Sequence, residues 1–542
     1  MRRQGERHLG LSRPPAVISD PQPANELPDD STGPLRIGLT ISGAVSLGAY
    51  EGGALAALLV ALKELSSRSP DVVVVDAIAG ASAGSMTGVL AAKGLLTDAD
   101  PLELMYQAWV EAPSLRRLRG RRRSAAPLSV DKVQSTAREL LGDSYPRGAG
   151  APQQAPVELQ LALGALRGLD YTFRRLQAPP LDATTYLDWY ALTFRPQDGA
   201  EAYLDALDPA LASGAHAVAF PPRVLSRAER RADYERNGVT NFPPGGELWY
   251  TDGGTIDNEP LGRALDMTGR LDESSQGRRL NLLIVPDPSF PVAADSPEWA
   301  DPNRAPLWLQ TLARAGKMAI AQTLYDDLRR AEKTNSRLTW TDQLVDTLAS
   351  HLTPDAAPAL ADLIERFEST RSEDLGASST QPAPPPKPDD PIPVLLQRAM
   401  AAATGLQGKR PIAVDAVSPL ILGADTREAV NKRLAGEKFG HFFGFLDRRL
   451  RISDFALGYT CMLAWLDDPA RGLRARGVPP ELVTEAVAAA SARQDSAWTD
   501  EGGFGVSRLR LGAWIQLVRL SLHTVRLAGS DLLAWPRRQR RG

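Results

Sequence analysis

The sequence predicts an α/β fold in which a mostly parallel sheet is flanked by helices. The apolar run Arg36–Ile41 follows a proline, and a second apolar run, Val72–Val75 with Ala77–Ala79, is rich in β-branched residues. Both runs are typical of buried strands. Each is followed by a glycine-containing turn and then by an Ala- and Leu-rich segment typical of a helix, at Ala49–Leu65 and Ser85–Leu96. This alternation favours parallel pairing, because parallel strands need a crossover connection.

Beyond the second helix the pattern is less regular. Residues 101–244 begin helical and continue with further helical segments and proline-rich turns, whereas Glu247–Tyr250 and Leu280–Val285 are typical of strands. The later part of the chain is mostly helical in pattern and is interrupted by a proline-rich stretch. We therefore expect a flexible tail (1–33), an α/β domain (34–300), a helical extension (301–375), a Pro-rich linker (376–393) and a helical C-terminal region (394–542).

Composition narrows the class of protein. The 542 residues carry a net charge of −3, unlike the strongly basic chains of general nucleic-acid binders, so no nucleic-acid partner is expected. The single cysteine, Cys461, is expected to be a small buried apolar residue. The N-terminus has no apolar segment of a secretory signal, and the longest apolar stretch, Ala54–Leu62, is far shorter than the ~20 residues of a spanning helix. We expect a cytoplasmic protein of bacterial origin, at most peripheral at a membrane.

A candidate nucleophile lies between the second strand and its helix. Gly80–Gly84 fits the pattern G-x-S-x-G, with Ser82 at its centre. A glycine-rich turn that merely packs a strand against a helix would have the same sequence. The position of the motif favours a nucleophile, because a strained strand-to-helix turn lifts the serine hydroxyl out of the sheet edge. The helix that follows also directs its N-terminal N–H groups toward the site where negative charge would develop.

A serine hydroxyl needs a base to become a good nucleophile. The chain has only five histidines, none in a motif-like setting after a strand: His8, His216, His351, His441 and His523. Asp252 ends an apolar run and precedes Gly253 and Gly254, which let the backbone turn sharply. A partly buried aspartate with a raised pKa can accept the serine proton directly. A simple Asp-Gly turn between strands is the structural alternative.

With these residues identified, the chain resembles the patatin-like phospholipase family. Ser42–Gly53 (SGAVSLGAYEGG) is similar to the family's glycine-rich oxyanion loop and the helix after it. Gly80–Gly84 is similar to its nucleophile elbow, and Asp252–Pro260 (DGGTIDNEP) to its Asp-Gly-Gly/Ala segment with Asn-x-Pro. Ser213–Pro222 resembles the family's Ala/Ser-rich segment ending in Phe-Pro-Pro, and Phe439–Leu457 resembles a C-terminal segment of some larger bacterial members.

The resemblance covers roughly residues 36–289 and implies a three-layer α/β/α core, with a patatin-like catalytic domain in 34–300. It implies a catalytic dyad without histidine, in which Ser82 is the nucleophile and Asp252 the base. The implied reaction is hydrolysis of acyl esters of lipids, of the phospholipase A or esterase type, through an acyl-enzyme. No metal and no other cofactor is expected.

The oxyanion loop departs from the family pattern, which is usually Gly-Gly-Gly-x-Arg/Lys-Gly. Here Gly43 is followed by Ala44 and Val45, and Leu47 stands where a basic residue is usual. The backbone N–H groups of Gly43, Ala44 and Val45, with that of Ala83, are the expected oxyanion donors. Alanine and valine resist the positive φ that glycine permits, and loss of one donor typically lowers the rate by ~10²–10³.

Two other functions therefore remain open. The altered loop is compatible with a weakly active or inactive patatin-like scaffold or lipid-binding protein. A less favoured alternative is an α/β-hydrolase with a Ser-His-Asp triad that uses His441.

The expected partner is a lipid or another acyl ester, and the sequence does not predict an oligomeric state. The basic cluster Arg116–Arg123 would add ~1 kcal/mol of attraction per arginine to anionic headgroups, or would be a solvated loop. The C-terminal stretch Leu509–Arg541 mixes Trp and Leu with Arg, as an interfacial amphipathic helix does. A helix packed on the core with an exposed basic tail has the same pattern.

Overall fold

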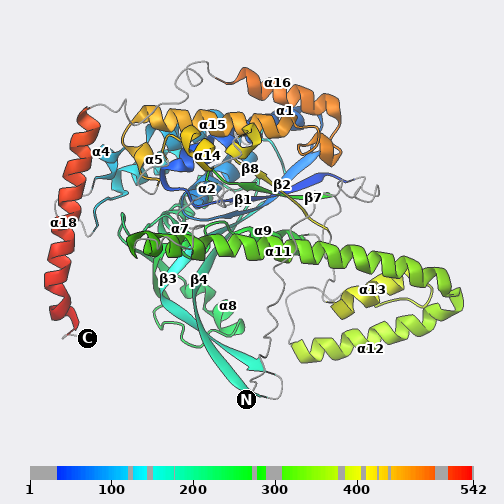
Figure 1. The fold of residues 1–542 in the computed structure, drawn as a ribbon. Helices are drawn as coiled ribbons and strands as arrows, with labels where there is room; N and C mark the ends of the chain where they lie inside the picture. The colour runs from blue at the N-terminus through cyan, green and yellow to red at the C-terminus, as the bar shows by residue number, and fades with distance from the viewer. Residues whose placement is uncertain are drawn as a thin grey trace, which may run out of the picture.

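A mixed, mostly parallel sheet forms the centre of the protein (Figure 1). The computed structural model describes residues 33–119, 126–142, 150–175, 178–271, 278–287, 308–375, 385–404, 411–423, 427–436, 441–494 and 511–539. Most of the expected N-terminal tail, 1–32, lies outside these residues. Within them the strands are β1 (Leu35–Ile41), β2 (Val73–Gly80), β3 (Val157–Arg175), β4 (Ala178–Phe194), β5 (Arg223–Ser226), β6 (Glu247–Asp252), β7 (Arg278–Ile284) and β8 (Ala413–Val417).

The strand order is β5-β6-β3-β2-β1-β7-β8, and β4 pairs with β3 outside this path. The pairs β3–β2, β2–β1, β1–β7 and β7–β8 are parallel, whereas β3–β4, β3–β6 and β5–β6 are antiparallel. The central parallel strands β1, β2 and β7 are almost completely buried, as expected for parallel strands that are covered on both faces. The predicted fold class, an α/β fold with a mostly parallel sheet, is thus confirmed.

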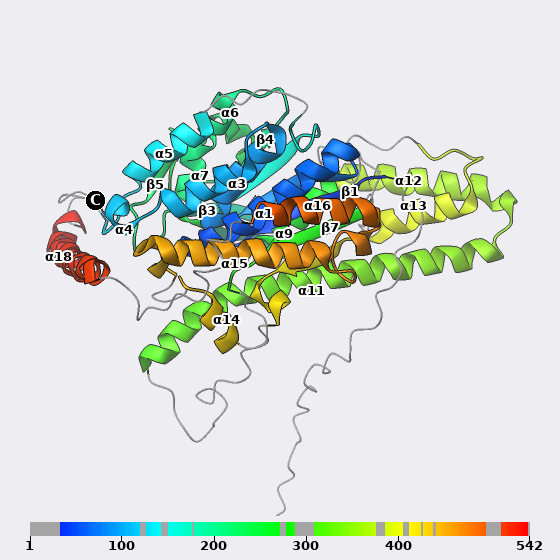
Figure 2. The ribbon, with the colours of Figure 1, turned by 90° about the horizontal axis from the view of Figure 1, so that it is seen from above.

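Helices cover both faces of this sheet. Figures 1 and 2 show α1, α2, α15 and α16 on one side and α9 with the long α11 on the other, which gives three layers. The described helices are α1 (Gly48–Arg68), α2 (Ala83–Leu96), α3 (Pro101–Tyr106), α4 (Leu115–Leu118), α5 (Asp131–Gly142), α6 (Ala200–Asp205), α7 (Leu207–Ser213), α8 (Arg231–Arg236), α9 (Leu261–Leu271), α11 (Trp308–His351), α12 (Ala357–Leu375), α13 (Ile392–Thr404), α14 (Arg427–Arg433), α15 (Arg448–Asp467), α16 (Pro480–Ala492) and α18 (Leu511–Gln539).

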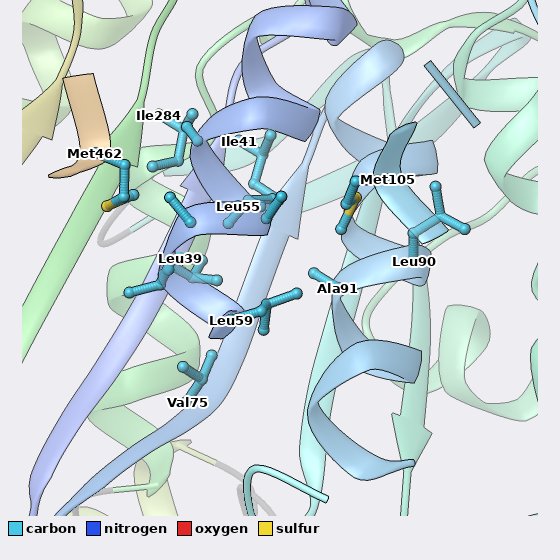
Figure 3. Packing of buried hydrophobic residues seen from close by; sticks show 14 of the residues in the cluster. Leu39, Ile41, Leu55, Leu59, Val75, Leu90, Ala91, Met105, Ile284 and Met462 are labelled. Carbon is cyan, nitrogen blue, oxygen red and sulfur yellow. The ribbon is translucent and has the colours of Figure 1, made fainter. Parts of the chain in front are cut away.

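The first helix is the centre of the main core. In Figure 3, Leu55 and Leu59 of α1 lie over Leu39 and Ile41 of β1, and Met462 of α15 approaches from the C-terminal region. By length and composition, Val45–Arg68 could cross a membrane. The expectation that no apolar segment is long enough for a spanning helix is therefore wrong. However, 89% of the apolar window in Val45–Arg68 is buried inside the protein, as in the core helix of a globular domain.

The C-terminal region is built into the same core. The α1 and α15 helices approach so closely that a Cβ on Gly53 would lie 2.0 Å from the Phe455 carbonyl oxygen, and one on Gly458 would lie 1.9 Å from that of Tyr50. The region is mostly helical, as predicted, but it also supplies β8, which pairs with β7. Cys461 is buried here, as expected.

The middle of the chain differs most from the sequence expectation. Residues 101–244 do contain helices, but they also form the long antiparallel hairpin β3–β4, which was not predicted. Its register is irregular between Gly164 and Leu169, so no single alternation of apolar and polar residues runs along the strand. Within the expected helical extension, α11 and α12 occupy residues 308–375, and they pack with α13 through a small apolar cluster. Residues 376–384 of the expected linker lie outside the described chain.

Candidate active site

Ser82 stands at the sharp turn between β2 and α2. Its backbone has φ 50° and ψ −119°, a conformation that non-glycine residues rarely adopt and that is found at strained functional turns. The flanking glycines make this turn possible. A Cβ on Gly80 would lie 2.6 Å from the carbonyl oxygen of Gly84, and one on Gly84 would lie 2.3 Å from that of Ile41. The Gly80–Gly84 motif therefore places Ser82 against the carboxyl end of the parallel strands.

Asp252 contacts Ser82 directly. The Ser82 hydroxyl donates to Asp252 Oδ2 at 2.9 Å, and the Gly254 N–H donates to Oδ1 at 2.8 Å. Both side chains are buried, with 5% of Ser82 and 2% of Asp252 exposed. Burial raises the pKa of Asp252 to about 6, whereas the hydrogen bonds from Ser82 and Gly254 lower it. At neutral pH this carboxylate is therefore mostly ionised, yet it is much more basic than an ordinary aspartate.

Close packing of the third motif fixes this geometry. Asp252 ends β6, opposite Leu163 of β3. A Cβ on Gly253 would lie 2.1 Å from the Ala162 carbonyl oxygen, and one on Gly254 would lie 2.8 Å from Asn258 Oδ1. The two glycines let the chain turn in the narrow space between β3 and the dyad. A larger residue at either position would displace β3 or the dyad.

A second serine, Ser213, holds the backbone of the nucleophile. Its Oγ accepts the Ser82 N–H at 3.0 Å and donates to the Ala162 carbonyl oxygen at 2.6 Å. The Ser85 hydroxyl lies 2.7 Å from it. Sequence reasoning did not assign Ser213 a role, although it begins the segment 213–222 that resembles the family. The signal was weak, because a lone serine after a helix has many ordinary functions.

The expected oxyanion loop lies beside the nucleophile, but its donors are not equivalent. The Gly43 N–H donates to the Asn258 carbonyl oxygen at 2.8 Å, so it is occupied in this conformation and the expectation that it is a free donor is corrected. Among the described residues, the N–H groups of Ala44, Val45 and Ala83 have no hydrogen-bond acceptor. Gly43 is needed for a steric reason, because a Cβ there would lie 2.4 Å from Asn258 Oδ1 and 3.1 Å from Ser82 Cβ.

Val45 shows the strain that the altered loop sequence predicts. Its φ is 51°, which is unfavourable for a β-branched residue. The C-terminal region holds the next residue in place: the Ser46 N–H donates to the His441 carbonyl oxygen at 3.0 Å, its hydroxyl donates to the same oxygen, and the Gly444 N–H donates to Ser46 Oγ at 3.1 Å. Strained conformations persist only where neighbouring contacts fix them in this way.

None of the histidines in the described part of the chain completes a Ser-His-Asp triad. The hydroxyl of Ser82 donates to Asp252, and the Nε2 of His441 instead lies 3.4 Å from Asp287 Oδ2. His216 is near the nucleophile, packs edge-on against Phe442 and has a pKa lowered by burial and then by the nearby His441. Within the described residues no histidine hydrogen-bonds to the Ser82 side chain, which disfavours the triad alternative.

An apolar pocket with a volume of about 100 Å³ is lined in part by Ser82 and Ala83. It runs between α2, α5, α7 and the π-helical turn η2 (Gln107–Glu111). Its lining side chains are apolar except for those of Ser82, Thr136 and His216 and the indole N–H of Trp109. Such a pocket can take a hydrocarbon chain whose head lies at the serine. In the described part of the chain no group of three His, Cys, Asp or Glu side chains could hold a metal ion.

The basic cluster and the C-terminal helix both lie on one side of this pocket. Arg116, Arg117 and Arg119 are exposed, whereas Leu115 and Leu118 of α4 are buried. Residues 120–123 of the cluster and residues 509, 510, 540 and 541 of the C-terminal stretch lie outside the described residues. Figures 1 and 2 show α18 beside α4.

Comparison with known proteins agrees with this architecture. The family model for "patatin-like phospholipase" matches residues 39–265. "Uncharacterized protein y4iI" of Sinorhizobium fredii (strain NBRC 101917 / NGR234) is 23% identical in an alignment of 441 residues, with a coverage of 62% of this chain and 60% of that protein. This chain thus aligns with less than two thirds of the length of that relative. The crystal structure of VipD from Legionella pneumophila is 12% identical and covers 86% of this chain and 89% of that one, with a TM-score of 0.21, too low to support a structural conclusion.

Proposed function

Because residues 39–265 form a patatin-like phospholipase domain, whose family consists of lipid acyl hydrolases, we propose that this protein is a serine hydrolase of lipid acyl esters that uses a Ser82–Asp252 dyad. The observation that carries the proposal is the 2.9 Å contact from the hydroxyl of Ser82, which helps to line an apolar pocket, to the buried Asp252 carboxylate. A hydroxyl, a base of raised pKa and a hydrocarbon site are the three parts that such a reaction needs.

In the proposed first half-reaction, Ser82 Oγ attacks the ester carbonyl carbon while Asp252 accepts the hydroxyl proton. The unbonded N–H groups of Ala44, Val45 and Ala83 are candidates to stabilise the negative oxygen of the tetrahedral intermediate. When this intermediate collapses, the bond to the alcohol breaks, and the leaving alcohol takes the proton from Asp252. The acyl group remains on Ser82 as an ester.

In the second half-reaction, Asp252 takes a proton from water as the water oxygen attacks the acyl carbon. Collapse breaks the ester bond to Ser82, the carboxylic acid leaves, and Ser82 Oγ recovers its proton from Asp252. The burial that raises the pKa of Asp252 serves both halves, because a more basic carboxylate accepts each proton more readily.

The pocket limits the acyl group that fits without rearrangement. An apolar cavity of roughly 150 Å³ holds benzene, with six carbons. A volume of about 100 Å³ therefore has room for roughly four carbons. We expect soluble esters with acyl chains of two to about four carbons to react faster than those with long chains, for which the pocket would have to widen.

Labelling with a fluorophosphonate probe tests the proposal. We expect the wild-type protein to be labelled, Ser82→Ala to lose all labelling and Asp252→Asn to be labelled at least ~10²-fold more slowly, as for loss of a general base. Ser226→Ala, which removes an exposed hydroxyl on β5, is the matched control and should label like the wild type. Labelling that persists in Ser82→Ala would overturn the assignment of the nucleophile.

The second candidate is a patatin-like scaffold or lipid-binding protein without catalytic activity. Two observations favour it: the strained Val45 in the loop, and the occupied Gly43 N–H. Absence of labelling in the wild type, with ester binding retained in the apolar pocket, would support this function over hydrolysis.

A further inference from the structure

The C-terminal helix α18 has two apolar sides, and only one of them is covered by the protein. On the inner side Ala513 is buried against Phe443 and Leu450, Leu517 packs on the same cluster, and Leu520 packs on the cluster that contains Phe445. On the outer side five large apolar side chains are between 45% and 71% exposed: Trp514, Ile515, Val518, Leu522 and Val525.

The outer side chains form a continuous stripe. At 3.6 residues per turn, these five positions fall within an arc of roughly 100° around the helix axis. Arg519 and Arg526, both exposed, follow one border of this arc, seven residues apart. Residues 511–530 contain no aspartate or glutamate. An apolar stripe bordered by arginine and free of acidic residues matches the surface of an anionic bilayer, where long basic side chains reach the headgroups while their neighbours enter the acyl boundary.

A second basic element lies next to this stripe. Leu115 and Leu118 of α4 belong to the same apolar cluster that Leu520 of α18 contacts. The intervening Arg116 and Arg117 are exposed, and so is the adjacent Arg119. None of these three forms an ion pair with a described acidic residue. The basic cluster that begins at Arg116 and the amphipathic C-terminal helix, which are far apart in the sequence, thus lie side by side in the folded protein.

This surface adjoins the candidate active site. Leu118, Phe220 and Phe445 belong to the cluster that Leu520 contacts, and the same three side chains line the apolar pocket together with Ser82. A flat partner seated on α18 and α4 would therefore lie on the pocket's side of the molecule.

We propose that the outer face of α18, with Arg116, Arg117 and Arg119, docks the protein on an anionic lipid bilayer. Docking itself does not depend on catalysis, whereas its benefit for delivering substrate to Ser82 rests on the proposed function. The charges and the apolar stripe act together: the arginines attract anionic headgroups over about a Debye length, and the apolar side chains then insert.

The test uses the full-length protein carrying Ser82→Ala, so that binding is measured without hydrolysis. Sedimentation is measured with vesicles of phosphatidylcholine alone and of phosphatidylcholine with 30% phosphatidylglycerol. We expect binding to the anionic vesicles that weakens in high salt. Val518→Asp/Leu522→Asp should reduce this binding at least tenfold through lost apolar burial. Arg519→Gln/Arg526→Gln should reduce it roughly 25-fold, at about fivefold per charge.

The matched control is Leu363→Asp on α12, since Leu363 is 62% exposed and Leu522 is 67% exposed. Leu363→Asp should bind like the unmodified protein, and all variants should keep the same circular dichroism spectrum and melting temperature. Equal loss of binding in Leu363→Asp and in the α18 variants would overturn the proposal, as would equal binding to neutral and anionic vesicles. So would α18 variants that bind vesicles normally but change the oligomeric state, because the stripe would then be an interface between copies of this chain.

A failure of docking and a failure of catalysis are distinguishable. In the catalytically intact background, the α18 variants should hydrolyse a soluble short ester like the wild type but should hydrolyse vesicle phospholipid at least tenfold more slowly. Absence of all hydrolysis together with normal vesicle binding would contradict the proposed enzyme and leave the docking surface in place.

Discussion

Replacing Asp252 by asparagine should stabilise the protein while removing its base. The pKa of Asp252 is raised from an ordinary 3.8 to about 6, chiefly by burial. Each tenfold change in proton affinity corresponds to 1.36 kcal/mol, so ionising this carboxyl costs about 3 kcal/mol more in the folded protein than in the unfolded chain. A neutral amide avoids that cost. Its oxygen can accept the Gly254 N–H, and its NH₂ can donate to Ser82 Oγ, so both contacts of the carboxylate are replaced.

The expected gain depends on pH with a definite sign. The folded-state pKa lies above the unfolded one, so the folded wild type binds more protons between pH 3.8 and about 6. Its stability is therefore lost as the pH rises through this window and stays at the lower level above it. Asp252→Asn has no such loss. The difference between the variant and the wild type should be near zero at pH 4, grow up to about pH 6 and reach roughly 1–3 kcal/mol at pH 8.

Urea denaturation at pH 4.5, 6 and 8 measures this difference. Asp346→Asn, at an exposed position on α11, is the matched control and should change stability by less than ~0.5 kcal/mol at every pH. Labelling by a fluorophosphonate should fall in Asp252→Asn at the same time, since an amide accepts no proton. An Asp252→Asn protein that is less stable than the wild type at pH 8, or equally shifted at all three values, would refute the reasoning that burial sets the basicity of this carboxylate.

Three further outcomes follow from the site. Hydrolysis of a soluble ester should fall about tenfold for each pH unit below about 6, as protonation removes the base Asp252, and a flat profile between pH 4 and 8 would contradict this assignment. Ser213→Ala leaves the buried Ser82 N–H without its acceptor, so it should lower the free energy of unfolding by ~1–3 kcal/mol. It should also slow ester hydrolysis, and Ser213→Thr should recover part of the lost rate. Gly43→Ala would bring a Cβ to 2.4 Å from Asn258 Oδ1, so the loop must shift, and we expect at least ~10²-fold slower labelling together with a lower melting temperature. Labelling at the wild-type rate would show that this loop is not part of the site.

The sequence by itself determined the parts of the fold and site that depend on local patterns. The strands β1 and β2 and the helices after them are continuous apolar runs separated by glycine turns, and this is enough to predict a parallel sheet with crossover helices. The Ser82 turn and the Asp252 turn carry glycines in fixed positions, because their backbones leave no space for a Cβ. The close packing at these two turns can therefore be recognised in the sequence from the positions of the glycines.

Tertiary structure decided the features whose partners are far apart in the chain. The hairpin β3–β4 has an irregular register, and β8 is a five-residue strand inside a helical region; each becomes a strand because a neighbouring strand pairs with it. Ser213 reaches the Ser82 N–H across 131 residues, and His441 reaches the loop at Ser46 across 395. Likewise, only folding brings α4 and α18 to the same side of the pocket. Such contacts arise from the packing of whole elements, and no short window of sequence contains both partners.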